Sequence, residues 1–429
     1  MTKSAPPSPT PSSENLLPKN GSSATEVFDS LEAMRTRDVR WREGRAFSLA
    51  YNAGPDALAV AEEAYRRFSG ENALNTEAFP SLKRIQAEVV AMAGVWLGAT
   101  TLSAGFMTSG GTESILMAVK AARDRLLALR GVCNPNMVLP TSAHAAFAKA
   151  GAYFGVEVRR VAVQPDWRAD VAAMREVTDE NTVLIVGSAP QYPQGVVDDI
   201  VGIAKIAIDF DINCHVDACM GGVTLAYLAR LGESNAPWNL QVPGVSSISV
   251  DLHKFGYTSK GASVIMYATK HLRSFQGFIT DDWLGGVYGS SGVLGTKSGG
   301  SMASAWAVMH FLGDDGYLRL TREAREATLQ LAESVRNSRD LVLRAEPEST
   351  LLCFGARDPS ALNVFAVADE LSKRGWYVDR QTPPDSLHCT VNAIHHDKID
   401  WFARDLHESV AIALGQQSSG SVGTYGTVE

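Results

Sequence analysis

Short apolar runs separated by longer amphipathic segments dominate the middle of the chain. Six of these runs are rich in β-branched residues and predict strands between residues 136 and 267: NMVLP, VEVRRVAV, TVLIVGSA, NCHVD, VSSISVD and ASVIMY. Most are separated by a stretch long enough for a helix, and this alternation predicts βαβ units and a mostly parallel sheet. ASVIMY follows VSSISVD after a short loop only, which indicates a hairpin or an antiparallel strand.

Helical periodicity dominates the chain before these strands. Helices are predicted over TEVFDSLEAMRTRD, over the segment after Pro55, and over FPSLKRIQAEVVAMAGVWLGA, whose start is marked by Pro80. The glycine-rich start of TSGGTESILMAVKAARDRLLALRG is expected to form a turn that leads into a long helix. The apolar residues at helical spacing in that helix are Ile115, Leu116, Val119, Leu126 and Leu127.

The pattern changes at Gly316. YLRLTREAREATLQLAESVRNSRD predicts a long charged helix, and TLLCFGA, ALNVFAVADELSKRGW and LHCTV follow as strand, helix and strand. We therefore predict an α/β protein with a large domain and a small C-terminal α+β domain. The expected divisions are a disordered leader (1–23), an N-terminal segment contributing to the dimer and active site (24–100), the large domain (101–315) and the small domain (316–429). The terminal GQQSSGSVGTYGTVE is expected to be mobile.

Composition and charge narrow the classes of function. The 429 residues are 45% hydrophobic and 20% charged, which is typical of a soluble globular enzyme. A net charge of -8 gives no sign of binding to nucleic acid or to an anionic membrane surface. No run reaches the ~18 apolar residues of a membrane span, and the Pro/Ser-rich start lacks the apolar core of a secretion signal. The five cysteines form no CxxC pair, so we expect no disulfide framework, no metal site and a cytoplasmic location.

A glycine-rich helix start is the first feature that indicates chemistry. At Ser109-Gly110-Gly111-Thr112 the free N–H groups and the helix dipole favour an anion such as a phosphate. No lysine follows at the spacing of a Walker loop. The alternative is a simple loop-to-helix turn with Thr112 as a cap.

Three single side chains follow predicted strands, where an open α/β sheet binds its ligands. His144 could stack on a flat aromatic ligand, or it could be structural. Asp217 ends a buried strand, where a carboxylate is costly unless paired, so it either pairs with a cation or caps the next turn. Lys254 ends another strand and suits a Schiff-base lysine, although most lysines lie on the surface.

These four features together match the needs of pyridoxal phosphate. The phosphate of this cofactor needs N–H donors, its ring needs a stacking face, its pyridine nitrogen needs a carboxylate, and its aldehyde needs a lysine. The sequence therefore predicts a pyridoxal-phosphate site built from the four features.

The runs that hold these residues resemble the sphingosine-1-phosphate lyase family, pyridoxal-phosphate enzymes of fold type I in the decarboxylase-like branch. The similar runs are TSGGTESILMAVKAARD, SAHAAFAKA, HVDACMGG, SISVDLHKFGYTSKGAS, DDWLGGVYGS and FLGDDGY, and the resemblance covers roughly residues 40 to 425. It implies a seven-stranded-type sheet and a homodimer with shared active sites, in which the 285–300 loop reaches the neighbouring site. The membrane helix of the family has no counterpart here, as expected of a soluble bacterial-type member without a stable membrane anchor.

The resemblance also implies roles for the matching residues. Lys254 would bind the cofactor aldehyde, His144 would stack on its ring, and Asp217 would pair with its ring nitrogen. The residues implied in holding the phosphate are Gly110, Gly111 and Thr112, with help from His253 and Asp251. The residues implied in proton transfer are Lys254, Lys260 and Tyr51, and those implied in substrate binding are Asn72, Asn75, Tyr192 and Lys297.

Three positions depart from the family pattern. Asn75 and Gln194 stand where histidines are expected, and Lys297 stands where an arginine is expected, which keeps a charge but loses a bidentate fork. The predicted activity is cleavage of the C2–C3 bond of a 2-amino-3-hydroxy substrate, phosphorylated as in sphingosine 1-phosphate. The alternatives are an amino-acid decarboxylase on the same scaffold and a non-catalytic binding protein, and retention of the cofactor residues argues against the second.

Overall fold

A computed structural model describes residues 17–233, 236–415 and 420 of the chain. Most of the predicted leader and most of the predicted mobile C-terminal segment lie outside the described residues. The chain divides into two compact units, residues 1–40 and 41–429. In the first unit, α1 (Ala24–Met34) begins with a capping box between Ser23 and Glu26, and a 3-10 helix (Arg35–Arg37) follows it. The helix predicted over TEVFDSLEAMRTRD is therefore confirmed.

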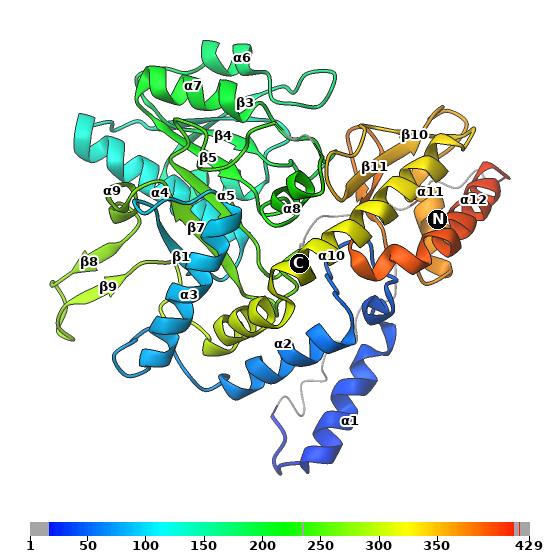
Figure 1. Ribbon diagram of the computed structural model, residues 1–429, viewed down its shortest axis with the longest axis horizontal. Coiled ribbons are helices and arrows are strands. Elements are labelled where there is room, and N and C mark those ends of the chain that lie inside the picture. Colours follow the sequence, from blue (N-terminus) through cyan, green and yellow to red (C-terminus); the bar gives the residue numbers. More distant parts are fainter. Residues whose placement is uncertain (1–16, 234–235, 416–419, 421–429) are drawn as a thin grey trace. The chain divides into compact units, whose positions relative to one another are not determined.

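The second unit is built on a seven-stranded sheet in the order β1-β7-β6-β5-β4-β2-β3 (Figure 1). Its strands are β1 (Ala104–Thr108), β2 (Asn136–Pro140), β3 (Glu157–Val161), β4 (Thr182–Ser188), β5 (Asn213–Asp217), β6 (Ser247–Val250) and β7 (Ser263–Tyr267). Strands β3, β2, β4, β5 and β6 are parallel to their neighbours in this series, whereas β7 is antiparallel to β6 and to β1. The mostly parallel sheet and the antiparallel ASVIMY strand are confirmed.

Helices cover both faces of this sheet, because alternate side chains of each strand point to opposite faces. Leu184 and Val186 of β4 join the apolar cluster of α4 and α5, whereas Ile185 between them joins the cluster of α3 and α7. The helices of this part of the chain are α2 (Pro55–Arg67), which packs on α10 (Gly299–Arg336), and α3 (Pro80–Trp96), α4 (Gly111–Arg130), α5 (Ala146–Phe154), α6 (Val171–Glu176), α7 (Ile200–Phe210), α8 (Thr224–Arg230) and α9 (Lys270–Ser274). Burial on both faces explains why the interior strand β4 is a nearly continuous apolar run.

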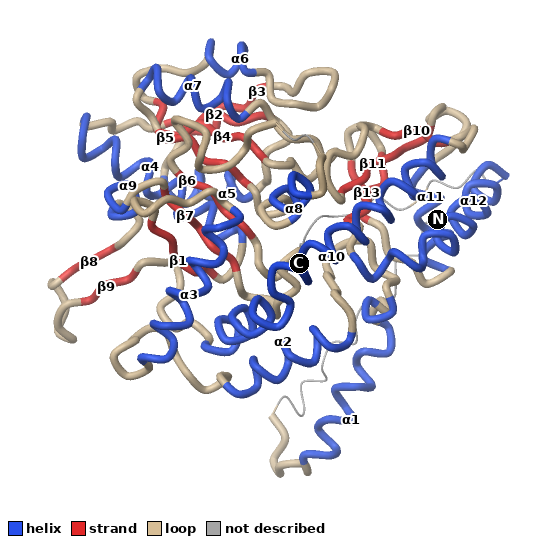
Figure 2. The backbone as a smooth tube through the Cα atoms, viewed as in Figure 1, coloured by secondary structure: helices blue, strands red, loops and turns tan. Residues whose placement is uncertain are grey.

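A smaller antiparallel sheet lies in the C-terminal part of the second unit (Figure 2). Its order is β10 (Leu341–Leu343), β11 (Leu351–Ala356), β13 (Ser386–Thr390) and β12 (Asp379–Gln381). Helices α11 (Val364–Lys373) and α12 (Ile399–Gly415) pack together beside it. The remaining short elements are two 3-10 helices (Trp41–Glu43 and Ala393–Lys398) and the hairpin of β8 (Phe278–Thr280) and β9 (Tyr288–Ser290). The predicted α+β character of this part is confirmed.

Helix α10 (Gly299–Arg336) links the two sheets. It begins well before the helix predicted after residue 316, and its backbone leaves helical geometry at Gly313 (φ 58°, ψ -175°). The expected boundary between residues 315 and 316 thus falls inside this helix, close to its kink, and the domain limits stay a prediction. Across the described ranges, we find no helix with the length and apolar character needed to cross a bilayer.

Candidate active site

A cavity of about 610 Å³ opens at the carboxyl ends of the parallel strands. The loops that follow β1, β4, β5 and β6 line it, as the general rule for open α/β sheets predicts. Ten of the predicted site residues are among its lining residues: Gly110, Gly111, Thr112, His144, Tyr192, Asp217, Asp251, His253, Lys254 and Lys260. The fold therefore brings together the four sequence features from which the site was predicted.

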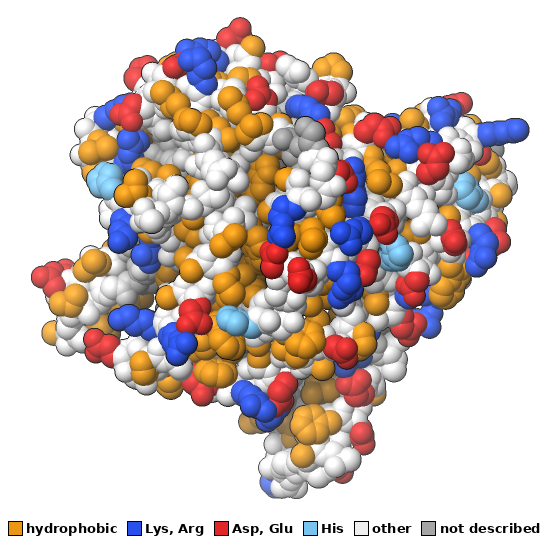
Figure 3. Space-filling view, in the orientation of Figure 1, with side chains coloured by type: hydrophobic (Ala, Val, Ile, Leu, Met, Phe, Trp, Pro, Cys, Tyr) orange, Lys and Arg blue, Asp and Glu red, His pale blue; other side chains and the backbone are white. Residues whose placement is uncertain are grey.

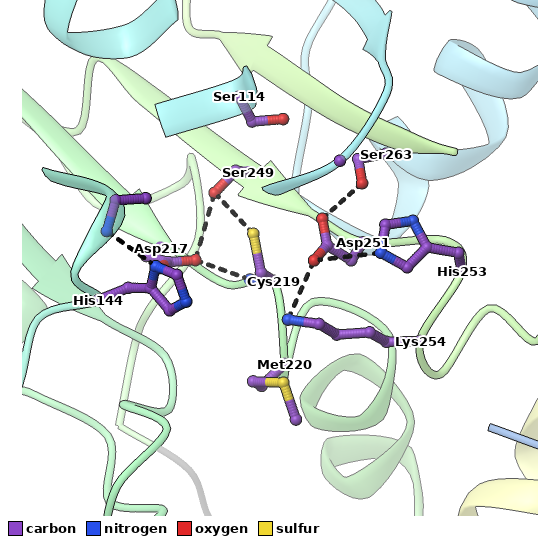
Figure 4. Close-up of polar contacts among 12 residues, drawn as sticks. Ser114, His144, Asp217, Cys219, Met220, Ser249, Asp251, His253, Lys254 and Ser263 are labelled. Carbon is purple, nitrogen blue, oxygen red and sulfur yellow. Dashed lines mark hydrogen bonds and ion pairs between the residues drawn. The ribbon is translucent and has the colours of Figure 1, made fainter. Parts of the chain in front are cut away.

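Lys254 lies at the centre of the polar groups in this cavity (Figure 4). Its ammonium is 3.0 Å from a carboxylate oxygen of Asp251, which is almost fully buried. Burial alone would raise the pKa of Asp251, but the charges of Lys254 and His253 and hydrogen bonds, including one from Ser263, lower that pKa to about 2. Asp251 is therefore a permanent anion that orients the amine of Lys254.

The glycine-rich start of α4 forms a close-fitting cradle at one side of the cavity. A Cβ atom added to Gly111 would lie 2.9 Å from both Asp251 Oδ2 and Cys219 Sγ, so only glycine fits there. The first N–H groups of an α-helix have no partner within the helix, and the positive end of its dipole favours an anion. The cradle thus suits a phosphate group that needs backbone donors at close range.

His144 and Asp217 lie side by side across the cavity from Lys254 (Figure 4). The Nδ1 atom of His144 accepts a hydrogen bond of 3.1 Å from the Ala146 N–H, which fixes the ring at the start of α5. Burial lowers the pKa of His144, so its ring is neutral and suited to stacking. Asp217 is 8% exposed at the end of β5, and its carboxylate accepts hydrogen bonds from the Cys219 N–H (3.1 Å) and the Ser249 hydroxyl (3.4 Å).

Lys260 lines the same cavity, and Tyr51 lies beside Lys260. The Lys260 ammonium donates hydrogen bonds to the Leu49 carbonyl (2.8 Å) and the His253 carbonyl (3.3 Å), and it lies 4.9 Å from the centroid of the Tyr51 ring. Tyr51 does not line the cavity, but its hydroxyl is 3.8 Å from the sulfur of Met220, which does. Although the Lys260 side chain is partly exposed, desolvation of its ammonium and the charge of Lys254 lower its pKa to about 8.

The shifted pKa of Lys260 leads to a prediction for the pH dependence of the reaction. A lysine that accepts a proton must be neutral, so kcat should rise with pH through about 8 and level off above it. In Lys260→Met this rise of kcat with pH should be lost, whereas the surface variant Lys205→Met should keep it. The measurement is the pH profile of kcat for the three proteins. If kcat of Lys260→Met still rises near pH 8, the rise belongs to the titration of another group.

Three predicted substrate residues lie outside this cavity of the single chain. The side-chain oxygens of Asn72 and Asn75 accept hydrogen bonds from Leu74 N–H and Glu77 N–H, both at 2.9 Å, so they hold turns. The ammonium of Lys297 lies 3.9 Å from the centroid of the Phe106 ring. Their predicted roles in substrate binding stay predictions.

Tyr192 lines the cavity and connects separate parts of the second unit. Its hydroxyl donates a hydrogen bond to Asp379 of β12 and lies 3.1 Å from the Ser48 hydroxyl. Burial and the charge of Asp379 raise the pKa of Tyr192, so it is a neutral phenol. Tyr192 therefore connects the N-terminal segment, the large sheet and the small sheet beside the cavity.

Sequence reasoning missed Glu113 among the lining residues. Its carboxylate accepts hydrogen bonds from Ser109 N–H (2.6 Å) and from Val293 N–H (2.8 Å), so it ties the glycine-rich loop to the 285–300 loop. The sequence does show an acidic residue in the first turn of this helix. Acidic residues are common there because they interact favourably with the helix dipole, so the position alone does not indicate a functional residue.

Comparisons with known proteins show which family the chain is similar to. A family model described as the pyridoxal-dependent decarboxylase conserved domain matches residues 8–357. Sphingosine-1-phosphate lyase 1 of Rattus norvegicus is 37% identical over 397 residues, which is 92% of this chain and 69% of the rat protein. The structure of the Burkholderia pseudomallei sphingosine-1-phosphate lyase is 35% identical with a TM-score of 0.88 and covers 93% of both chains. A Lactobacillus brevis glutamate decarboxylase (18% identical, TM-score 0.81, covering 94% of this chain and 95% of that one) shares the fold.

Proposed function

The chain belongs to the pyridoxal-dependent decarboxylase family and, within it, to the sphingosine-1-phosphate lyases, and we propose that it cleaves a phosphorylated 2-amino-3-hydroxy substrate. It is a pyridoxal-phosphate-dependent lyase. The proposed products are an aldehyde and an amine, which are a long-chain aldehyde and phosphoethanolamine if the substrate is sphingosine 1-phosphate. The observation that carries the proposal is the convergence of Lys254, Asp217 and His144 on one cavity beside the glycine cradle.

The residues around the cavity fit pyridoxal phosphate group by group. Lys254 would bind the aldehyde, and Asp217 and His144 would face the ring nitrogen and the ring plane. The N-terminus of α4 would hold the phosphate, since the missing Cβ of Gly111 leaves the room that the backbone donors need. When bound, the cofactor supplies an aldehyde that condenses with amines and a ring that accepts the electrons of a broken bond.

The chain itself must move two protons in this reaction. One leaves the 3-hydroxyl of the substrate so that the C2–C3 bond can break and release an aldehyde, and another is delivered to C2 of the amine product. Lys254 and Lys260 line the cavity and Tyr51 lies beside them, so these three side chains are the proposed proton carriers. Tyr192, a neutral phenol at the cavity wall, is proposed to contact the substrate.

The products distinguish the proposed lyase from a decarboxylase on the same fold. The purified protein with pyridoxal phosphate is incubated with sphingosine 1-phosphate and, separately, with glutamate and aromatic amino acids, and aldehyde and carbon dioxide are assayed. We expect aldehyde and phosphoethanolamine from the first incubation and no carbon dioxide from the others. Carbon dioxide without aldehyde would show that the chain is a decarboxylase.

A homodimer is proposed from the exposed surface of the β8–β9 hairpin. Its side chains Phe278, Ile279 and Trp283 are largely exposed, and Figure 3 shows apolar side chains at this edge of the molecule. Apolar side chains gathered on a protruding element are typical of an interface. The 285–300 loop starts in this hairpin and is proposed to reach the partner's site, although its Val293 and Leu294 also line the cavity of their own chain.

The role of the hairpin can be tested by changing its charge. We expect Trp283→Asp to lower the sedimentation coefficient to that of a monomer, because a buried unpaired charge at an apolar interface is costly. Asp281→Ser in the same hairpin is the matched control and should stay dimeric. A dimeric Trp283→Asp protein would place the interface elsewhere.

The five cysteines are all free, which supports the further proposal that the protein works in the reducing cytoplasm.

A further inference from the structure

Four polar side chains lie side by side in the interior of the large sheet, on the neighbouring strands β5 and β6. His215 and Asp217 of β5 and Ser247 and Ser249 of β6 are all buried. In the parallel register His215 lies opposite Ser247, and Asp217 lies opposite Ser249. Since alternate residues share a face, the four side chains lie on one face, while Val216 and Ile248 between them join the apolar cluster of the other face.

These side chains form one continuous series of hydrogen bonds that zigzags between the two strands. The Ser247 hydroxyl is 2.9 Å from His215 Nδ1, and His215 Nε2 is 3.2 Å from the Ser249 hydroxyl. The Ser249 hydroxyl in turn donates to Asp217 over 3.4 Å (Figure 4). The series therefore ends on the carboxylate of Asp217, which lines the cavity, and it begins at Ser247, which does not.

The chemistry of the end groups fixes the direction of every hydrogen bond. A carboxylate can only accept, so the one proton of the Ser249 hydroxyl is used toward Asp217. Ser249 must then accept from His215 Nε2–H. Burial lowers the pKa of His215 to about 4, so its ring is neutral and carries one N–H only. Nδ1 is thus an acceptor, and the Ser247 hydroxyl must donate to it.

We propose that Ser247, His215 and Ser249 are positioning residues that hold the Asp217 carboxylate in the orientation needed by the ring nitrogen of the cofactor. The proposal rests on the role proposed above for Asp217. Ser247 acts at a distance: its donated hydrogen bond keeps the proton of His215 on Nε2, and that proton is the reason why Ser249 donates toward Asp217. Without Ser247 the His215 proton can move to Nδ1, and the Ser249 proton can then turn away from Asp217 toward Nε2.

The chain offers a matched pair of serines to test this relay. Ser247→Ala removes the first hydroxyl of the series, and Ser246→Ala removes a neighbouring buried hydroxyl whose partners are the main-chain N–H and carbonyl of Cys214, at 2.7 and 2.8 Å. Both variants lose one buried hydroxyl from the same run. Only Ser247→Ala breaks the series that reaches Asp217, so a purely structural role of buried serines would affect the two variants alike.

The readouts are the absorbance of the bound cofactor as a function of pH, its dissociation constant, kcat and KM. In Ser247→Ala we expect the pH midpoint of the change in cofactor absorbance to fall by about 0.5 to 1 unit. The reason is that an Asp217 carboxylate that can rotate stabilises the proton on the ring nitrogen less. Its kcat should fall about 10-fold with KM unchanged, and its cofactor dissociation constant should rise about 5-fold. Ser246→Ala should match the parent protein in all four, and Ser247→Thr should restore them.

Equal behaviour of Ser247→Ala and Ser246→Ala in the spectral titration and in kcat would overturn the relay. If Ser247→Ala does not fold, Ser247→Cys is the substitute variant, because it replaces a strong hydrogen-bond donor by a weak one. We expect it to change the same four quantities in the same directions, by smaller amounts. A failure of the proposed function is distinguishable, because then the parent protein itself would show no cofactor band and no aldehyde. A normal parent with an unaffected Ser247→Ala variant overturns the relay alone.

Discussion

Replacement of Lys254 by alanine is expected to abolish lyase activity and to remove the absorbance band near ~420 nm that a lysine-bound pyridoxal phosphate gives. Lys254 is the lysine whose amine lies 3.0 Å from the buried Asp251 at the centre of the cavity. Alanine has no amine that could bind the cofactor, so kcat should fall by at least ~10³-fold. The measurements are the absorbance spectrum of the protein with added cofactor and the rate of aldehyde release.

Lys260→Ala is the control for this change, because it removes another lysine that lines the same cavity. It should keep the ~420 nm band, since the proposed role of Lys260 is proton transfer and not attachment of the cofactor. A Lys254→Ala protein that retains the band, or a Lys260→Ala protein that loses it, would move the attachment point away from Lys254.

The second large effect is expected at Asp217. Asp217→Asn keeps the size of the side chain but removes the charge that is proposed to pair with the ring nitrogen, so kcat should fall by ~10²- to 10³-fold while the ~420 nm band remains. The loss should appear in kcat because the charge acts on electron density that reaches the ring only during bond breaking. Single-turnover aldehyde release and the absorbance spectrum are the measurements.

Asp198→Asn is the matched control for Asp217→Asn. Asp198 is another buried carboxylate; it does not line the cavity and accepts hydrogen bonds from Ala169 N–H and Ser188 N–H, both at 2.8 Å. An amide cannot accept both, so Tm should fall while kcat stays within about 3-fold. If Asp217→Asn shows the same pattern as Asp198→Asn, Asp217 is structural and its pairing with the ring nitrogen is wrong.

The large sheet could be predicted from the sequence because its strands are buried on both faces. TVLIVGSA and NCHVD stand out as apolar runs, and helix-sized spacing between such runs leaves few topologies besides a parallel sheet. β1 was missed, since AGFMT is short and carries no β-branched residue before its last position. It forms a strand only because β7 offers it an antiparallel partner, which is a tertiary effect.

The cavity residues could be predicted because several separate loops end at the same edge of one sheet. His144 and Lys254 follow strands and Asp217 ends one, so the topology itself brings them together. Asn75 and Lys297 follow no strand of this sheet, and local turns and ring contacts decide their positions in the single chain. His215 and Ser249 were not singled out as polar groups, because their contact depends on the register between β5 and β6.

Reductive trapping of the cofactor tests the central claim most directly. The protein is saturated with pyridoxal phosphate, reduced with borohydride so that the bond between lysine and cofactor becomes permanent, digested, and mapped by mass spectrometry. We expect one modified lysine per chain, Lys254, in the peptide that contains DLHKFGY. Modification of Lys260 or Lys297 in place of Lys254, or no modified lysine at all, would contradict it.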